Sequence, residues 1–282
     1  MGLIFYAYYE TENTRYNLEY FLRFGGIQKN HQYVIVVNGT SSVEFPTGEN
    51  IRVIYRPNVG YDFGAYRAGV DAVGDETLKN HNFFVFMNAS VIGPISHQPS
   101  DWDWVEHFRE RFLERPVGLF GTTVVCLHPK DRGGFGPKVE SFFWCTHYQG
   151  LQLLLKEGTI LCDHPTKYSA IVNGEYGLSN CLFGKPAFNL GCMLSRYRGI
   201  DWRNYSNWHH NHYRHPSRHL SFFGKSIDPY EVIFHKWFWE GEPLVQKDVI
   251  DKHVFGKIQS RVYFSKNLEK EKGKKNYIGH II

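Results

Sequence analysis

The chain has 282 residues, of which 42% are hydrophobic and 17% aromatic, so it can bury one sizeable core and is long enough to be an enzyme. Its net charge of +4 comes from 32 basic and 28 acidic residues, and much of the excess lies in residues 266–275. A charge this small and this local argues against a nucleic-acid groove.

Cysteine usage and hydropathy predict a soluble, cytoplasmic protein. The five cysteines are widely spaced and form no Cys-x-x-Cys pair, which favours buried thiols in a reducing compartment over a disulfide set. No run approaches the roughly 20 apolar residues of a membrane helix. Glu10 comes too early for the first nine residues to form a secretory signal.

The first part of the chain predicts four strands with helices between some of them. Apolar residues at helical spacing occupy 16–24 and 65–73. Runs rich in β-branched and aromatic residues, without polar alternation, are typical of strands covered on both faces. The alternation predicts a Rossmann-like, doubly wound α/β sheet, in which ligands bind beyond the carboxyl ends of the strands. The four predicted strands are residues 3–9, 33–37, 51–55 and 83–87, and their carboxyl ends are 8–10, 38–39, 58–62 and 88–90.

The turn after the third strand is the first candidate site. The strand breaks at Pro57 and a helix begins through Gly60 and Gly64, which brings backbone N–H groups and a helix N-terminus to one point. Such a point favours an anionic ligand, so the turn predicts phosphate or nucleotide recognition. With Gly69, the glycine spacing matches neither the dinucleotide fingerprint nor the P-loop.

Residues 101–103 read Asp-Trp-Asp, the Asp-x-Asp pattern with which many sugar-nucleotide enzymes hold a divalent ion. The alternative is that Ser100 caps a helix whose first acids complement the helix dipole. We favour the cap, because a metal-binding carboxylate pair is expected where a core strand ends. Residues 88–90, Asn-Ala-Ser, occupy that place.

The second part of the chain predicts further strands at 117–125, 139–145 and 187–194, and a helix at 150–156. Another helix is expected to begin near Glu175, ahead of Leu178 and Leu182. A carboxylate at this place could be the general base for a hydroxyl nucleophile. It could equally be a first-turn partner of the helix dipole, and the sequence leaves both interpretations open.

Residues 197–219 are rich in Arg, His, Trp, Tyr and Asn. The histidine spacings fit no standard zinc ligand set. Aromatic and hydrogen-bonding side chains without an apolar period favour a carbohydrate or ligand wall, or a lid packed on the sheet. Residues 267–276 form a charge run without an apolar face, which predicts a solvated tail.

Seven segments of the chain carry a resemblance to known proteins: 58–66, 86–94, 121–123, 139–142, 174–179, 197–202 and 228–236. Together they resemble a family of GT-A-type glycosyltransferase-like proteins found in algae, fungi, plants and large algal viruses. The first segment is also similar to the Asn-x-Gly-x-Asp turn of bacterial rhamnan-synthesis glycosyltransferases. The resemblance implies a GT-A fold, with a mixed, mostly parallel sheet flanked by helices and an aromatic, His-rich acceptor region. It implies one domain at 1–265, with a donor half at about 1–125, an acceptor half at about 126–265, and a basic tail at 266–282.

The resemblance implies a hexosyl- or pentosyltransferase that moves a sugar from a nucleotide sugar to a hydroxyl of a glycan or glycoprotein. A UDP-sugar such as UDP-xylose or a UDP-hexose is the expected donor, and the host cytoplasm is the expected location if the protein is viral. The expected general base is Glu175, with Asp201 second. The expected donor-binding residues are Tyr8, Tyr9, Asn58, Gly60, Asp62, Arg67, Asn88, Ala89 and Ser90, and the expected acceptor-binding residues are Trp202, Trp208, His209 and His212.

The cofactor is where the chain departs from the general GT-A pattern. Asn-Ala-Ser at 88–90 replaces Asp-x-Asp, and Mn²⁺ and Mg²⁺ prefer carboxylate oxygens. Either Asp62 or a later histidine such as His235 supplies a metal ligand, or Arg56 and Arg67 neutralise the diphosphate. The same departure keeps open a second class, a non-catalytic carbohydrate-binding protein on this fold. Nucleic-acid binding is a weaker third class, because the aromatic residues mostly sit in core-like runs.

Overall fold

The computed structural model describes residues 1–98, 102–131, 133–183, 185, 188–239 and 250–251. Met1–Glu242 form one compact unit, and the second unit, Pro243–Ile282, contributes only Ile250 and Asp251 to the described part. The predicted boundary at 265 and the predicted basic tail at 266–282 lie outside the described residues.

The first unit is built on a seven-stranded sheet in the order β3-β2-β1-β4-β8-β5-β9. Strands β1 to β4 are mutually parallel, β8 runs antiparallel to both of its neighbours, and β9 is parallel to β5. The expected mixed, mostly parallel sheet is therefore confirmed. Its strands are β1 Gly2–Tyr8, β2 Gln32–Asn38, β3 Ile51–Arg56, β4 Phe83–Asn88, β5 Val117–Gly121, β8 Phe143–Thr146 and β9 Asn189–Cys192, and β6 Val124–Leu127 with β7 Gly136–Val139 forms a separate antiparallel pair.

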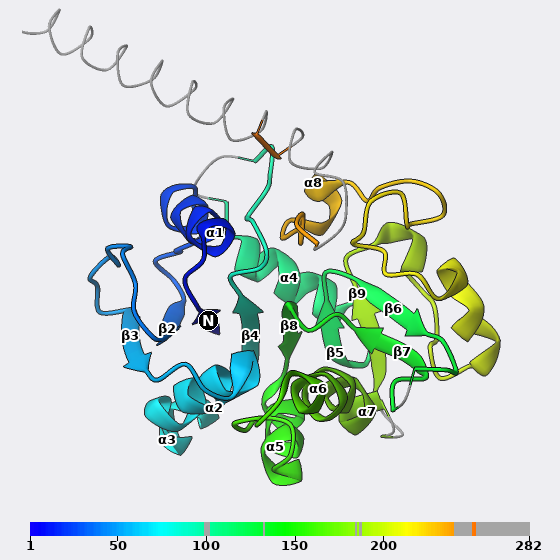
Figure 1. The fold of residues 1–282 in the computed structure, drawn as a ribbon, viewed down its shortest axis with the longest axis horizontal. Coiled ribbons are helices and arrows are strands. Elements are labelled where there is room, and N and C mark those ends of the chain that lie inside the picture. The colour runs from blue at the N-terminus through cyan, green and yellow to red at the C-terminus, as the bar shows by residue number, and fades with distance from the viewer. Residues whose placement is uncertain (99–101, 132, 184, 186–187, 240–249, 252–282) are drawn as a thin grey trace, which may run out of the picture. The chain divides into compact units, whose positions relative to one another are not determined.

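Helices cover both faces of the sheet (Figure 1), as strands without polar alternation require. Helices α1 and α4 lie on one side, and α2, α3, α5, α6 and α7 lie on the other. The helices are α1 Glu12–Arg23, α2 Tyr61–Val73, α3 Asp75–Lys79, α4 Trp104–Leu113, α5 Tyr148–Glu157, α6 Lys167–Ser169, α7 Gly177–Phe183 and α8 Pro229–Val232, with a π-helix at Ala170–Tyr176 and 3₁₀ segments at Ser195–Tyr197 and Tyr205–Tyr213.

Aromatic side chains fill the space between the sheet and both helical layers. On the α2 side, the ring centroids of Phe5 and Phe86 are 4.7 Å apart, and Trp144 stacks on Phe86 at 4.0 Å. On the α4 side, Phe143 and Phe234 stack at 4.8 Å. Such pairs add about 0.5–1.5 kcal/mol each beyond their buried area, so the high aromatic content stabilises the sheet that carries the site.

The register brings five segments to one edge of the sheet. Tyr8 pairs with Val37, Asn38 with Arg56, and Ala7 with Asn88, so the four parallel strands end side by side. Because β8 is antiparallel, it begins where β4 ends. The backbone N–H of Asn88 donates to the carbonyl of Phe142 at 3.1 Å, just before β8. Residues 140–142 therefore join the strand ends at 8–10, 38–39, 56–62 and 88–90.

Three predicted element boundaries were wrong. The predicted strand 139–145 is two strands, because residues 140–142 leave the sheet between β7 and β8. The predicted strand 117–125 likewise breaks at Thr122 and Thr123, between β5 and β6. The helix expected to begin near Glu175 begins at Lys167, capped by Thr166, and passes through the π-helix into α7. The apolar spacing at Leu178 and Leu182 marked only its last turns.

The predicted helix cap before α4 is present, with a different residue as the cap. Asp103 is the N-cap, and its carboxylate accepts from the N–H of Glu106 at 2.9 Å. The same carboxylate lies 2.8 Å from Nε2 of His31, whose Nδ1 accepts from the N–H of Gly2 at 2.8 Å. Ser100, the expected cap, lies outside the described residues. Asp103 therefore ties α4 to β1 and has a structural role.

Replacing Asp103 by Ala should lower the free energy of unfolding by about 1–3 kcal/mol, since it removes a helix cap and the partner of a buried histidine. Urea unfolding followed by far-UV circular dichroism measures this. Asp103→Asn keeps a capping oxygen and should lose less. Unchanged stability in Asp103→Ala, or loss of nucleotide binding in the still-folded variant, would contradict the structural role.

Candidate functional site

The turn between β3 and α2 forms one wall of the site and requires glycine at position 60. Gly60 is the N-cap of α2 and adopts a left-handed conformation with φ of 74°. A Cβ added there would lie 2.0 Å from Oδ1 of Asp163. Asp163 also forms an ion pair with Arg56 at 2.6 Å, and this pair holds the loop that contains Asp163 against the turn. Close approach and positive φ together exclude any other residue without rearrangement.

A hollow of about 570 Å³ lies between this turn and residues 163–165. It brings together four of the expected donor-binding residues, Tyr9, Asn58, Gly60 and Asp62. Asn38, at the end of β2, also lines it, and the side-chain oxygen of Asn38 is buried without a hydrogen-bond partner among the described residues. A concave site with a few buried polar groups suits a nucleoside-sized ligand.

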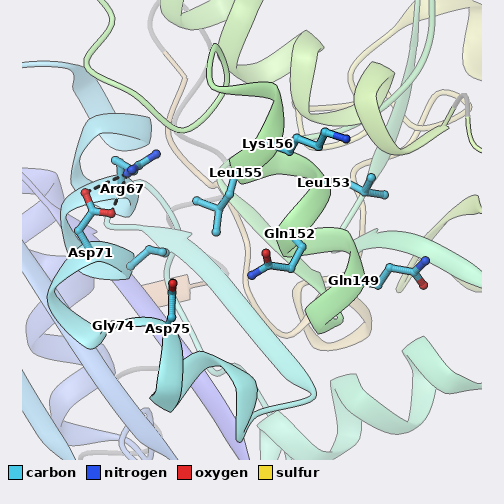
Figure 2. A pocket seen from close by; sticks show the side chains of 10 residues that line it. Arg67, Asp71, Gly74, Asp75, Gln149, Gln152, Leu153, Leu155 and Lys156 are labelled. Carbon is cyan, nitrogen blue, oxygen red and sulfur yellow. Dashed lines mark hydrogen bonds and ion pairs between the residues drawn. The ribbon is translucent and has the colours of Figure 1, made fainter.

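Two other expected donor-binding residues lie elsewhere. The Tyr8 side chain is buried in the core, and its hydroxyl donates to Glu10 at 3.1 Å. Arg67 pairs with Asp71 at 2.9 Å in a different pocket (Figure 2). That pocket has a volume of about 750 Å³ and is lined by α2, α3, the glycine between them and α5. This pocket is larger than the hollow, but its described lining residues belong to helices and to the glycine between them rather than to the ends of strands.

The end of β4 holds Asp62 through an amide. The side-chain N–H of Asn88 donates to Oδ2 of Asp62 at 2.6 Å. The other end of that amide accepts from the backbone N–H of Ser90 at 3.0 Å and from its hydroxyl. Ala89, between them, is buried and its N–H donates to the carbonyl of Ala7 at 3.0 Å. Burial raises the pKa of Asp62, while Asn88 and then Lys236 oppose that rise.

These residues do not fit a strong divalent-cation site. At the end of β4 the donors are an amide, a hydroxyl and the Asp62 carboxylate, whose Oδ2 already accepts from Asn88. Mg²⁺ and Mn²⁺ prefer several carboxylate oxygens. Within the described part of the chain, no three or more His, Cys, Asp or Glu side chains are grouped so that they could hold a metal. His235, the other metal candidate, is buried where its backbone pairs with Ile92.

Glu175 and Lys236, from two other parts of the chain, interact electrostatically with Asp62. Glu175 lies in the π-helix, a conformation that is frequent at functional sites. Burial raises its pKa, Asp62 adds to the rise, and Lys236, a hydrogen bond with Ser141, and His215 oppose it. Burial lowers the pKa of Lys236, against the influence of nearby carboxylates that include Glu175 and Asp62. The site therefore holds opposite charges on side chains that are partly withdrawn from water.

Glu140 is a buried acid that the sequence reasoning did not assign. Its carboxylate lies 2.8 Å from Nδ1 of His215 and accepts from the hydroxyls of Ser217, at 3.1 Å, and Thr123. Burial alone would raise its pKa, but these hydrogen bonds and the charge of His215 lower it overall. Glu140 and Lys236 both lie in segments that carried the family resemblance, which was the signal that could have identified them.

The expected acceptor residues occupy the 3₁₀ segment Tyr205–Tyr213 and the chain just before it. Trp202 is a core residue, and its carbonyl accepts from the indole N–H of Trp208 at 2.8 Å. His209 is exposed and bonds the Tyr213 hydroxyl at 2.7 Å, and His212 is exposed in a left-handed conformation with φ of 50°.

Asp201, the second expected base, is paired away from the charged cluster. It forms an ion pair with Arg203 at 2.8 Å on the surface, and this hydrogen bond is the main cause of its lowered pKa. The groups that shift the pKa of Glu175 include Asp62 and Lys236, whereas the pKa of Asp201 is set by Arg203, so the two candidate bases have different electrostatic partners.

Residues 47–152 match the family model of rhamnan synthesis protein F. The match covers less than half of the chain and runs from just before β3 to the middle of α5. It contains the turn, the end of β4 and Glu140, while Glu175, His215 and Lys236 lie beyond it. No curated protein matches the chain. Among the described residues, no helix has the length and apolar character needed to cross a membrane.

Replacing Glu175 by Gln should raise the thermal unfolding midpoint at pH 7. Because the folded-state pKa of Glu175 lies above its unfolded value, its favourable contribution is complete below the unfolded pKa and is lost as pH rises through the folded one. The difference from the parent should therefore shrink toward pH 4. Differential scanning calorimetry at both pH values measures it, with exposed Glu157→Gln as the control. An unchanged or lower midpoint at pH 7 would show that burial of the ionised Glu175 carboxylate does not destabilise the folded state.

Proposed function

We propose that this protein is a glycosyltransferase that moves a hexosyl or pentosyl group from a nucleotide sugar to a hydroxyl of a glycan or glycoprotein. One observation carries the proposal: Asp62, at the carboxyl edge of the sheet, lines a hollow of nucleoside size and interacts electrostatically with Glu175 and Lys236. Ligands bind at this edge in open α/β sheets. The match to rhamnan synthesis protein F over residues 47–152 supports a role in glycan synthesis.

The donor nucleoside occupies the hollow beside the turn, with a UDP-sugar as the favoured donor. Tyr9 is about half exposed at its wall and offers a ring for the base, while Asn38 and Asn58 offer amides. The diphosphate then lies over residues 88–90, and the sugar lies toward Glu175. The five cysteines are free, which supports a reducing, cytoplasmic location.

In the reaction, the acceptor hydroxyl oxygen forms a bond to C1 of the donor sugar. The bond between C1 and the diphosphate oxygen breaks, and its electron pair leaves with the nucleoside diphosphate. The hydroxyl proton passes to Glu175, which acts as general base if the configuration inverts. A raised pKa suits this role, because a base is most effective when its pKa lies near the working pH.

A second candidate function is carbohydrate binding without catalysis. The amide and hydroxyl of Asn88 and Ser90 in place of an acidic pair favour it, as does the exposed ring of Tyr205, 5.1 Å from that of Trp208. A panel of UDP- and GDP-sugars, with and without EDTA, separates the two functions. Donor hydrolysis, or a melting shift with one nucleotide sugar, supports the enzyme, and a response to free glycans alone supports the binding protein.

Replacing Glu175 by Gln should lower turnover by about 10²–10⁴-fold, the usual contribution of a general base. Donor affinity should stay the same, because the amide keeps the size of the side chain. Release of nucleoside diphosphate measures turnover, and isothermal titration calorimetry measures affinity. Glu157→Gln, at an exposed position at the end of α5, is the matched control. Turnover equal to that of the parent would remove Glu175 from the base role.

Replacing Asp62 by Ala should weaken nucleotide binding by about tenfold or more, because the half-buried amide of Asn88 loses its charged partner and the turn loses its orientation. Calorimetric titration with UDP and GDP gives the affinities. Asp71→Ala, which removes an acid from the same helix outside the hollow, is the control. A dissociation constant unaltered by Asp62→Ala would place the nucleotide elsewhere.

A further inference from the structure

A donor diphosphate needs positive charge beside it, and the two arginines near the turn do not supply it, because both are already in ion pairs. Arg56 is paired with Asp163 at 2.6 Å, and Arg67 with Asp71 at 2.9 Å. The residues at the end of β4 do not fit a divalent cation, for the reasons given above. A different cationic group must therefore lie beside residues 88–90 if a diphosphate binds there.

Lys236 lies next to that place because of a short backbone pairing. The N–H of Ile92 donates to the carbonyl of His235 at 3.0 Å, and the N–H of His235 donates to the carbonyl of Ile92 at 2.9 Å. Lys236, the next residue in the chain, therefore lies beside the segment that follows β4. Its ammonium senses the charges of Asp62, Glu175 and Glu140. The ammonium is therefore at the edge of the sheet where the strands end.

Lys236 faces aromatic rings rather than an ion-pair partner within the described part of the chain. No carboxylate of the described residues lies within 4.0 Å of the ammonium, which instead faces the rings of Trp239 at 4.1 Å and Phe142 at 5.6 Å. A partly buried cation without an ion pair is costly unless a ligand completes it.

A second cation and an unused donor lie at the same ring. The guanidinium carbon of Arg218 is 4.6 Å from the centre of the Trp239 ring, and Arg218 and Lys236 repel each other. The indole N–H of Trp239 is buried and has no hydrogen-bond partner among the described residues. Two like charges and a free N–H donor around one ring are complementary to an anion with several oxygen acceptors.

We propose that Lys236, with Arg218 and the indole N–H of Trp239, binds the diphosphate of the donor and neutralises the charge on the leaving group, in place of a divalent cation. This deepens the proposed function and rests on it. The electron pair of the broken C1–O bond is stabilised on the diphosphate by fixed cations, which need no metal to arrive with the donor.

The test is calorimetric titration of the full chain with UDP and with inorganic pyrophosphate in the presence of EDTA. The parent should bind both. Lys236→Met should weaken both by about tenfold to a hundredfold, the size of a lost charge-assisted hydrogen bond. Lys236→Arg should keep most of the affinity, because it keeps the charge. Lys225→Met removes an exposed lysine and should change nothing.

Uridine is the internal control, because it fills the hollow without a diphosphate. Its binding should be the same in the parent and in Lys236→Met, which also shows that the variant is folded. Binding of UDP only when Mn²⁺ or Mg²⁺ is present, or equal pyrophosphate binding in the parent and Lys236→Met, would overturn the proposal. Metal-free pyrophosphate binding that depends on Lys236, with no turnover of any nucleotide sugar, would contradict the proposed function alone and leave the anion site standing.

Discussion

The site depends on holding oppositely charged side chains close together while they are partly withdrawn from water. Asp62, Glu175, Glu140 and Lys236 come from four elements and affect one another's ionisation. A buried charge costs several kcal/mol unless partners compensate it. The fold compensates unevenly: Glu140 accepts three hydrogen bonds, Asp62 accepts one from Asn88, and Lys236 faces aromatic rings. The groups with the least compensation are those with the most to gain from a ligand.

The antiparallel strand β8 makes this cluster possible. In a wholly parallel sheet, each strand would bring only its carboxyl end to the ligand edge. Because β8 is reversed, the residues before it arrive at the same edge as the residues after β4. The edge thus receives Glu140 and Ser141 from the amino side of one strand and Asn88 from the carboxyl side of its neighbour. One reversed strand therefore supplies both the acid and the hydroxyl that contact the rest of the site.

The sequence predicted the sheet well, because buried parallel strands are long apolar runs. It also placed Tyr9, Asn58, Gly60 and Asp62 together, since carboxyl ends of parallel strands must meet. The partner of Arg67 was missed although it was predictable, because Asp71 lies one helical turn away and opposite charges commonly pair at that spacing. Local patterns in the sequence could not bring Glu140 and Lys236 together with the rest of the site, for a different reason. Their neighbourhood arises from β8 and from the pairing of 92 with 235, which are contacts between distant parts of the chain. No local spacing records such contacts.

The π-helix that carries Glu175 makes the site sensitive to the loss of a residue in this segment. Its backbone hydrogen bonds close wider turns than those of an α-helix, so the segment 170–176 holds an extra residue within a continuous helix. Loss of one residue there would let the segment continue as an α-helix and would rotate everything before it by about 100° relative to α7. The direction of the Glu175 carboxylate is thus encoded by the length of this segment, and related chains that share the site should tolerate substitutions in it far better than deletions.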